Sequence, residues 1–170
     1  FNDLVTGVTN GLGGGVDITY SPITDPSVYT RTAATAYPDL TVESPLYVVK
    51  TYRRRDGQGW STTYRNEYTD LMTDLDQGQW LGFRTLTVIE EATGRKVTNR
   101  MAQEFPQQGF VKQTDGYDGS GVLYQTTVHS PVTIEPYPGV YQVLNRKTVR
   151  TFYQDGQQAY TTEDDYEYDG

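Results

Sequence analysis

Residues 46–68 read LYVVKTYRRRDGQGWSTTYRNEY, and this stretch decides the fold class. Two runs rich in Thr, Val and Tyr flank the sequence Asp56-Gly57-Gln58-Gly59. β-Branched and aromatic residues favour strands, and an Asp-Gly pair favours a tight turn because glycine readily adopts positive φ. The stretch therefore predicts a long antiparallel hairpin, with strands over residues 46–55 and 60–68.

The same pattern recurs on both sides of this hairpin. Four further pairs of strand-like segments flank clusters of turn-forming residues: 4–9 with 16–20, 83–91 with 96–105, 110–114 with 122–128, and 140–153 with 159–168. Only residues 70–79 offer apolar side chains at helical spacing, and Gly78 leaves room there for one short helix or a loop. The sequence predicts an all-β fold of consecutive long antiparallel β-hairpins.

Residues 21–45 interrupt this regular pattern. They contain four of the eight prolines and show little periodicity. Proline cannot donate a main-chain hydrogen bond to a sheet. We therefore expect a long ordered loop or a crossover at the edge of the sheet.

One internal repeat links two of the hairpins. Asp56-Gly57-Gln58 is followed by Thr62-Thr63 and Asp70, and Asp155-Gly156-Gln157 is followed by Thr161-Thr162 and Asp169. The threonine offsets are the same in both copies. The repeat predicts that both Asp-Gly pairs lie at the tips of structurally equivalent hairpins.

Composition limits what kind of protein this is. Thr (25), Val (16) and Tyr (15) outnumber Ala (6) and Lys (4), as is typical of a pleated, half-buried surface. Leu, Ile, Val and Phe together number 35 of 170 residues, so the apolar core should be thin and need neighbouring chain to cover it. The net charge of −8 argues against nucleic acid or an anionic membrane as a partner, and no apolar run approaches the roughly 18 residues of a membrane span.

Few residues are available for catalysis or metal binding. The chain has no cysteine and one histidine, His129, which excludes thiol chemistry and sites rich in histidine. We interpret His129 as a strand-end side chain with ordinary hydrogen bonds. The run Gly119-Ser120-Gly121 is not the nucleophile elbow of a serine hydrolase.

The acidic loop at residues 115–121 is the stretch of the sequence that most resembles a calcium-binding loop. It reads DGYDGSG, but Tyr117 stands where an EF-hand loop needs an oxygen ligand, and the distant Glu is missing. A Gly-rich hairpin turn is the preferred interpretation. Paired carboxylates for glycoside hydrolysis could come from six glutamates, but an acidic chain always offers such pairs. These are Glu43, Glu67, Glu90, Glu91, Glu104 and Glu135.

Two further groups of side chains could bind a ligand. Arg53-Arg54-Arg55 could hold an anion, but alternate residues of a strand face opposite ways, so we favour a solvated strand end. A salt-bridged contact with the acidic residues 163–165 is the alternative. Trp60 and Trp80 could stack on a sugar, although we expect them to pack against the sheet. The sequence thus assigns no catalytic, cofactor-binding or metal-ligating residue and no cofactor.

A set of short motifs carries a resemblance to a known family. In chain order they are Asp3-Leu4-Val5-Thr6, Thr9-Asn10-Gly11-Leu12-Gly13, Ile18-Thr19-Tyr20, Asp25-Pro26-Ser27-Val28-Tyr29-Thr30, Tyr37-Pro38, Pro45-Leu46-Tyr47-Val48-Val49, Leu81-Gly82-Phe83-Arg84, Thr87-Val88, Phe105-Pro106, Gly109 and Tyr166-Glu167-Tyr168-Asp169-Gly170. Their order resembles the middle/N-terminal region of Tc-toxin B components and of SpvB-type and Rhs/YD-repeat insecticidal toxins. The resemblance covers essentially the whole chain and departs from the family at the glycines 13–15 and at residues 130–139.

The resemblance implies a structural role in virulence and no reaction. Residues 1–170 would form a single β-rich segment of a larger secreted toxin, between a β-propeller and the YD/Rhs repeats that begin at its C-terminal end. The segment would be part of a larger β-shell that encapsulates a cytotoxic effector for translocation. Its partners would be the rest of its own chain, the C-type effector component and the A-type pore component of the Tc toxin complex.

The same resemblance implies no direct membrane insertion, and it leaves a cytoplasmic stage before secretion open. The chain begins at Phe1 without Met, which fits a piece of a larger protein. Two other functions stay open at this point: a carbohydrate- or protein-binding β-module of a secreted bacterial protein, and a glycosidase-like enzyme.

Overall fold

One open β-sheet makes up the protein. The structure is a computed structural model that describes residues 3–32 and 34–168. The described residues contain twelve strands and no helix, with 63% of these residues in β-structure. The predicted all-β fold of antiparallel hairpins is confirmed. No helix in the described ranges is long and apolar enough to cross a membrane.

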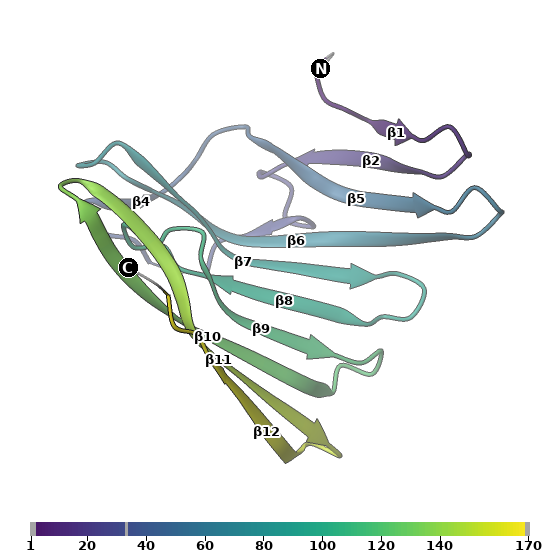
Figure 1. Ribbon diagram of the computed structural model, residues 1–170. Coiled ribbons are helices and arrows are strands. Elements are labelled where there is room, and N and C mark those ends of the chain that lie inside the picture. The colour runs from purple at the N-terminus through teal and green to yellow at the C-terminus, as the bar shows by residue number, and fades with distance from the viewer. Residues whose placement is uncertain (1–2, 33, 169–170) are drawn as a thin grey trace.

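The strands follow the chain with few long interruptions. They are β1 (Gly7–Thr9), β2 (Gly15–Pro22), β3 (Tyr29–Thr30), β4 (Asp39–Thr41), β5 (Tyr47–Arg55), β6 (Ser61–Asp74), β7 (Gln79–Glu90), β8 (Lys96–Met101), β9 (Val111–Tyr117), β10 (Leu123–Tyr137), β11 (Val140–Gln154) and β12 (Gln157–Asp165). The sheet order is β1-β2-β5-β6-β7-β8-β9-β10-β11-β12, and every pair along this path is antiparallel. Figure 1 shows β1 and β12 at opposite edges of this sheet.

Strand β6 is the spine of the sheet's first half. One of its edges pairs with β7 along most of its length. Its other edge is divided among β5, β3 and β4, which pair with successive parts of it. Strands β3 and β4 belong to residues 21–45, so of the two expected alternatives the segment is a crossover, and it adds two short strands to β6.

Two further stretches, which lie outside the predicted strands, belong largely to strands in the structure. Residues 70–79 form no helix, because β6 runs on to Asp74 and a turn over residues 75–78 leads into β7. Residues 130–139, where the resemblance departs from the family, belong mostly to β10. The register of β10 with β11 shifts between Ser130 and Pro131, where proline cannot donate to the ladder.

Both Asp-Gly pairs lie at hairpin tips, as predicted, but the two turns differ. Asp155 and Gly156 form a two-residue turn with φ of 52° and 75°, the left-handed pair that tight hairpins require. Asp56 opens a longer turn in which its amide donates to the carbonyl of Trp60 at 3.2 Å. The prediction of structural equivalence is therefore wrong beyond the position of the tips. Asp169, the last residue of the second copy, lies outside the described residues.

The hydrophobic core occupies one part of the sheet. Ile23, Val28, Val48, Tyr68 and Leu71 form its buried cluster. Tyr29, Val42, Phe83 and Leu86 pack against them. The segment between β2 and β5 thus covers one face of β6 and β7, and this is where the core sits.

Candidate functional site

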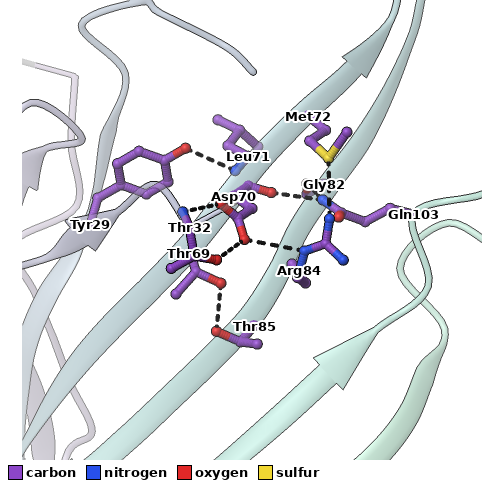
Figure 2. Close-up of polar contacts among 10 residues, drawn as sticks. All are labelled: Tyr29, Thr32, Thr69, Asp70, Leu71, Met72, Gly82, Arg84, Thr85 and Gln103. Atoms are coloured by element: carbon purple, nitrogen blue, oxygen red, sulfur yellow. Dashed lines mark hydrogen bonds and ion pairs between the residues drawn. The ribbon is translucent and has the colours of Figure 1, made fainter. Parts of the chain in front are cut away.

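The carboxylate of Asp70 in β6 is almost completely buried next to the core cluster. Its side chain is 1% exposed, and its backbone has the unusual positive φ of 48°. The amide and hydroxyl of Thr32 each donate to the carboxylate at 2.6 Å, and Nε of Arg84 donates at 3.1 Å. Figure 2 shows these contacts converging from three segments of the chain. The carboxylate therefore ties the crossover segment to the β6–β7 hairpin.

Side chains around Asp70 extend this junction. Nε2 of Gln103 donates to the carbonyls of Asp70, at 2.7 Å, and of Gly82, at 2.8 Å. The amide of Leu71 donates to the hydroxyl of Tyr29 at 3.0 Å, as Figure 2 also shows. The loop after β8 is thereby fixed to the place where β6 and β7 bulge. The Asp70 junction (Tyr29, Thr32, Asp70, Arg84 and Gln103) positions chain segments, since strong donors already bind the carboxylate.

A second buried carboxylate lies on β9. Asp115 is 3% exposed, forms an ion pair with Arg100, and accepts hydrogen bonds from Gln113 and, at 2.9 Å, from Thr126. Burial by itself raises the pKa of Asp115, but the hydrogen bonds from Gln113, Arg100 and Thr126 outweigh it and hold that pKa below its ordinary value. This carboxylate, too, is occupied by donors of its own sheet.

Asp115 belongs to a polar row that crosses the sheet. Cross-strand pairing places Thr87, Thr98, Asp115, Thr126, Thr151 and Thr161 in succession from β7 to β12. The hydroxyls of Thr87 and Thr98 lie 2.9 Å apart. This face of the C-terminal half is held by hydroxyl and carboxylate contacts.

The opposite face carries aromatic pairs. Tyr52 stacks on Tyr64 with 4.9 Å between ring centroids, and Phe152 stacks on Tyr160 with 4.5 Å. The register across the intervening strands places both pairs on the same face. Near the first pair, Trp60 is exposed, while Tyr47, Tyr52 and Tyr64 are half-buried.

The candidate calcium loop is a hairpin turn. Residues 118–122 connect β9 to β10, and Oδ1 of Asp118 accepts the amides of Ser120 and Val122, each at 2.9 Å. The turn also meets the β7–β8 turn, since a Cβ on Gly119 would lie 2.1 Å from the carbonyl oxygen of Thr93. Within residues 3–32 and 34–168, no group of three or more His, Asp or Glu side chains could hold a metal ion.

His129 lies inside β10, since that strand continues to Tyr137, so its prediction as a strand-end residue is wrong. Its Nδ1 lies 3.2 Å from the hydroxyl of Thr148, and its ring meets Phe110 edge-on. Burial, and then the charge of Arg150, lower the pKa of His129. These contacts are those of an ordinary half-buried histidine.

The candidate glutamates are distributed over the sheet, and most have local partners. Glu43, Glu67 and Glu104 form ion pairs with Arg31, Arg65 and Lys112, respectively. Glu90 accepts from the hydroxyl of Thr93 at 2.5 Å, and Glu135 accepts from the amide of Gly139 at 2.7 Å. Glu91 is exposed at the start of a turn. Each of these partners lies within twelve positions of its glutamate along the chain, so the contacts are local.

Arg53 and Arg54 are exposed at the end of β5, as the favoured interpretation has it, whereas the two tryptophans differ from their expected positions. Arg55 pairs with Asp17 at 2.8 Å, whereas Glu163 and Asp164 pair with Lys147 and Arg150 in the neighbouring strand β11. The alternative of a salt bridge between residues 53–55 and 163–165 is therefore wrong. Trp60 and Trp80 are 60% and 57% exposed, so the expectation that they pack against the sheet is also wrong.

Sequence reasoning did not single out the two buried aspartates. Asp70 stands in the stretch with weak helical spacing, and Asp115 was weighed only as a calcium ligand. Each aspartate forms an ion pair with an arginine of a neighbouring strand, Asp70 with Arg84 and Asp115 with Arg100, and only the strand register brings these residues together. No family model matches the sequence, and no match among curated proteins was found.

Proposed function

We propose that the chain is a non-catalytic structural segment in the shell of a Tc/Rhs-type bacterial toxin, where it would help to enclose a cytotoxic effector. The observation that supports this proposal best is the open sheet. Its two edges are β1, with three residues, and β12, with nine, and all of them are exposed. Unpaired strand edges present free main-chain donors and acceptors, and neighbouring strands of a larger sheet would satisfy them.

The composition of the faces also supports a wall rather than a catalytic domain. Among the described residues, the buried hydrophobic residues number eight and all lie between Ile23 and Ala102. The other described strands bury no hydrophobic side chain on either face. A segment with this little core gains stability when further chain packs on it, which is the situation of a strand group inside a larger shell.

A carbohydrate- or protein-binding module is the second candidate. The exposed indoles of Trp60 and Trp80 favour it, because exposed aromatic rings commonly provide contact area for ligands. Binding of the chain to a glycan array, lost when both tryptophans are replaced by alanine, would favour this candidate over the wall.

The test of the wall is protease access to an effector enclosed by the parent protein. Phe83 packs on Tyr68 and Tyr29, with ring centroids 4.8 and 6.3 Å away, so Phe83→Asp should open the wall. We expect faster cleavage of the effector and unchanged intrinsic effector activity. Phe83→Leu, which keeps the apolar contact, is the matched control. Unchanged protection, together with loss of an enzymatic activity that depends on a side chain of this segment, would contradict the proposal.

A further inference from the structure

Two hairpin tips meet at one corner of the sheet and form a small pocket. The turn between β1 and β2 packs on the turn between β5 and β6, as Figure 1 shows at the outer ends of these strands. The approach is so close that a Cβ on Gly57 would lie 2.5 Å from the carbonyl oxygen of Leu12. The pocket has a volume of about 240 Å³, and Arg53, Arg55, Trp60 and Ser61 line it.

The pocket is cationic although the protein is acidic. Arg53 and Arg55 are two positions apart in β5 and so point to the same face, whereas Arg54 points to the other. Arg53 donates to the hydroxyl of Ser61 at 3.0 Å and forms no ion pair within the described part of the chain. Two positively charged guanidinium groups therefore line the pocket, and Asp17, the partner of Arg55, is the one carboxylate in the described part of the chain that forms an ion pair with them.

One donor of the pocket is unused. Nε of Arg55 is buried and has no hydrogen-bond partner, because Asp17 binds the Nη2 atom of that side chain. The other nearby carboxylate, Asp56, accepts the amides of Gln58 and Trp60 through Oδ1 at 2.7 and 3.1 Å. A buried donor without a partner is costly, and an anion in the pocket would relieve that cost once the Arg55 side chain turns Nε toward it.

The remaining wall of the pocket is aromatic. Trp60 is 60% exposed, so its indole is open to a ligand. Guanidinium groups bind carboxylates through charge-assisted hydrogen bonds, and an exposed indole offers a flat apolar surface to the ring that bears the carboxylate. A pocket of about 240 Å³ has room for one such ring and no more.

We propose that this pocket binds an acidic sugar of the uronate class. The carboxylate of the sugar lies against the guanidiniums of Arg53 and Arg55, and its ring lies on Trp60. This inference does not rest on the proposed wall function, since the pocket opens at an outer corner of the sheet, away from the core cluster, and uronate binding at Trp60 would favour the binding module.

The test is a nuclear magnetic resonance titration of the full chain with galacturonate, galactose and inorganic phosphate. Galacturonate and galactose differ only in the carboxylate, so their comparison isolates the role of the arginines. The signals to follow are the amides of Gly57 and Gly59 and the indole N–H of Trp60. The variants are Arg53→Gln, Trp60→Ala and the matched control Arg54→Gln, which removes the same charge from the other face. A thermal melt of each variant checks that it is folded.

We expect saturable shifts with galacturonate and none with galactose at the same concentration. Arg53→Gln should weaken binding at least about tenfold, which corresponds to about 1.4 kcal/mol. Trp60→Ala should weaken it several-fold, and Arg54→Gln should change it by less than about twofold. Three results would overturn the proposal: equal losses for both arginine variants, no saturable shift, or phosphate binding as tight as galacturonate that Trp60→Ala leaves unchanged.

Discussion

The two halves of the sheet are held together by different interactions. Residues 21–103, here called the core region, contain all eight buried hydrophobic side chains of the described residues and the Asp70 junction. The C-terminal strands β9–β12 bury Asp115, Thr127 and Thr148 but no large apolar side chain. One sheet therefore joins a conventional packed domain to a region without a buried apolar cluster among its described residues.

This difference shows how a long sheet can be continuous in its main chain and uneven in its stability. Burial of an apolar side chain contributes about 1.5–3 kcal/mol, whereas an exposed ion pair such as Arg150–Asp164 contributes far less. The C-terminal strands depend on ladder hydrogen bonds and on stacking of Phe152 on Tyr160. They are the part of the sheet that gains most from neighbouring chain.

The largest expected effect is loss of a core side chain. Leu71→Ala should lower the free energy of unfolding by about 2–5 kcal/mol, because Leu71 is buried among the core cluster and its removal leaves a cavity. The counterpart in the C-terminal strands is Val128→Ala, at a residue that is 40% exposed, and we expect less than about 1 kcal/mol there. Urea denaturation followed by circular dichroism measures both. Equal losses would remove the distinction between the two regions.

The Asp70 junction should come next. Asp70→Ala should cost about 2–3 kcal/mol, because it leaves the buried donors of Thr32 without their acceptor. Asp155→Ala is the matched control, since Asp155 also has positive φ but lies in an exposed turn. The free energy of unfolding that Asp155→Ala loses reports the effect of the backbone conformation alone. Similar losses in the two variants would mean that the hydrogen bonds of Asp70 contribute nothing measurable.

The packed hairpin tips provide a smaller effect. Gly57→Ala should cost about 1–3 kcal/mol, because the new Cβ would collide with main-chain atoms of residues 12–14 and φ is +83°. Gly156→Ala changes the equivalent glycine of the other Asp-Gly turn, where φ is +75° and no atom lies within 4 Å. The difference between the two melting temperatures therefore isolates the contact between tips, and a difference of zero would contradict that contact.

The smallest effect is a pH dependence in the C-terminal strands. The pKa of Asp115 is lowered in the folded chain, so as the pH falls the carboxylate is protonated in the unfolded chain at a higher pH than in the folded chain. Stability from this group is complete above the ordinary pKa of about 3.9 and is lost as pH falls through the lower folded value. Asp115→Asn should therefore flatten the fall in stability below about pH 4. A fall as steep as that of the unaltered chain would show that Asp115 is not responsible.

The hairpins could be predicted from sequence because their information is local. Turn residues such as Asp155-Gly156 fix a tip, and the Thr-, Val- and Tyr-rich flanks fix its strands. The two-residue turn and the longer turn at Asp56 could not be told apart, because the same dipeptide occurs in both. Strands β3 and β4 were missed since their short pairing with β6 depends on tertiary contacts of Val28 and Val42.

The buried aspartates could not be predicted for a related reason. Asp70 becomes buried only when Thr32, 38 positions away, returns to β6 and donates to it. The pocket at the corner likewise requires two turns that are distant in sequence, one of them containing Gly57, to pack together. Trp60 and Trp80 are exposed although their large apolar area predicts burial. Whether a side chain is buried depends on which part of the chain covers its strand, and the side chain's own chemistry does not decide that.

Hydrogen–deuterium exchange of the main-chain amides tests the difference between the two regions most directly. Amides of β6 and β7 should exchange only through global unfolding, because the core region covers them. Amides of β11 and β12 should exchange at least about 100-fold faster through local opening of the bare hairpin. Uniform protection from β6 to β12 would show that the C-terminal strands are as stable as the core region, and it would contradict the view that they need neighbouring chain.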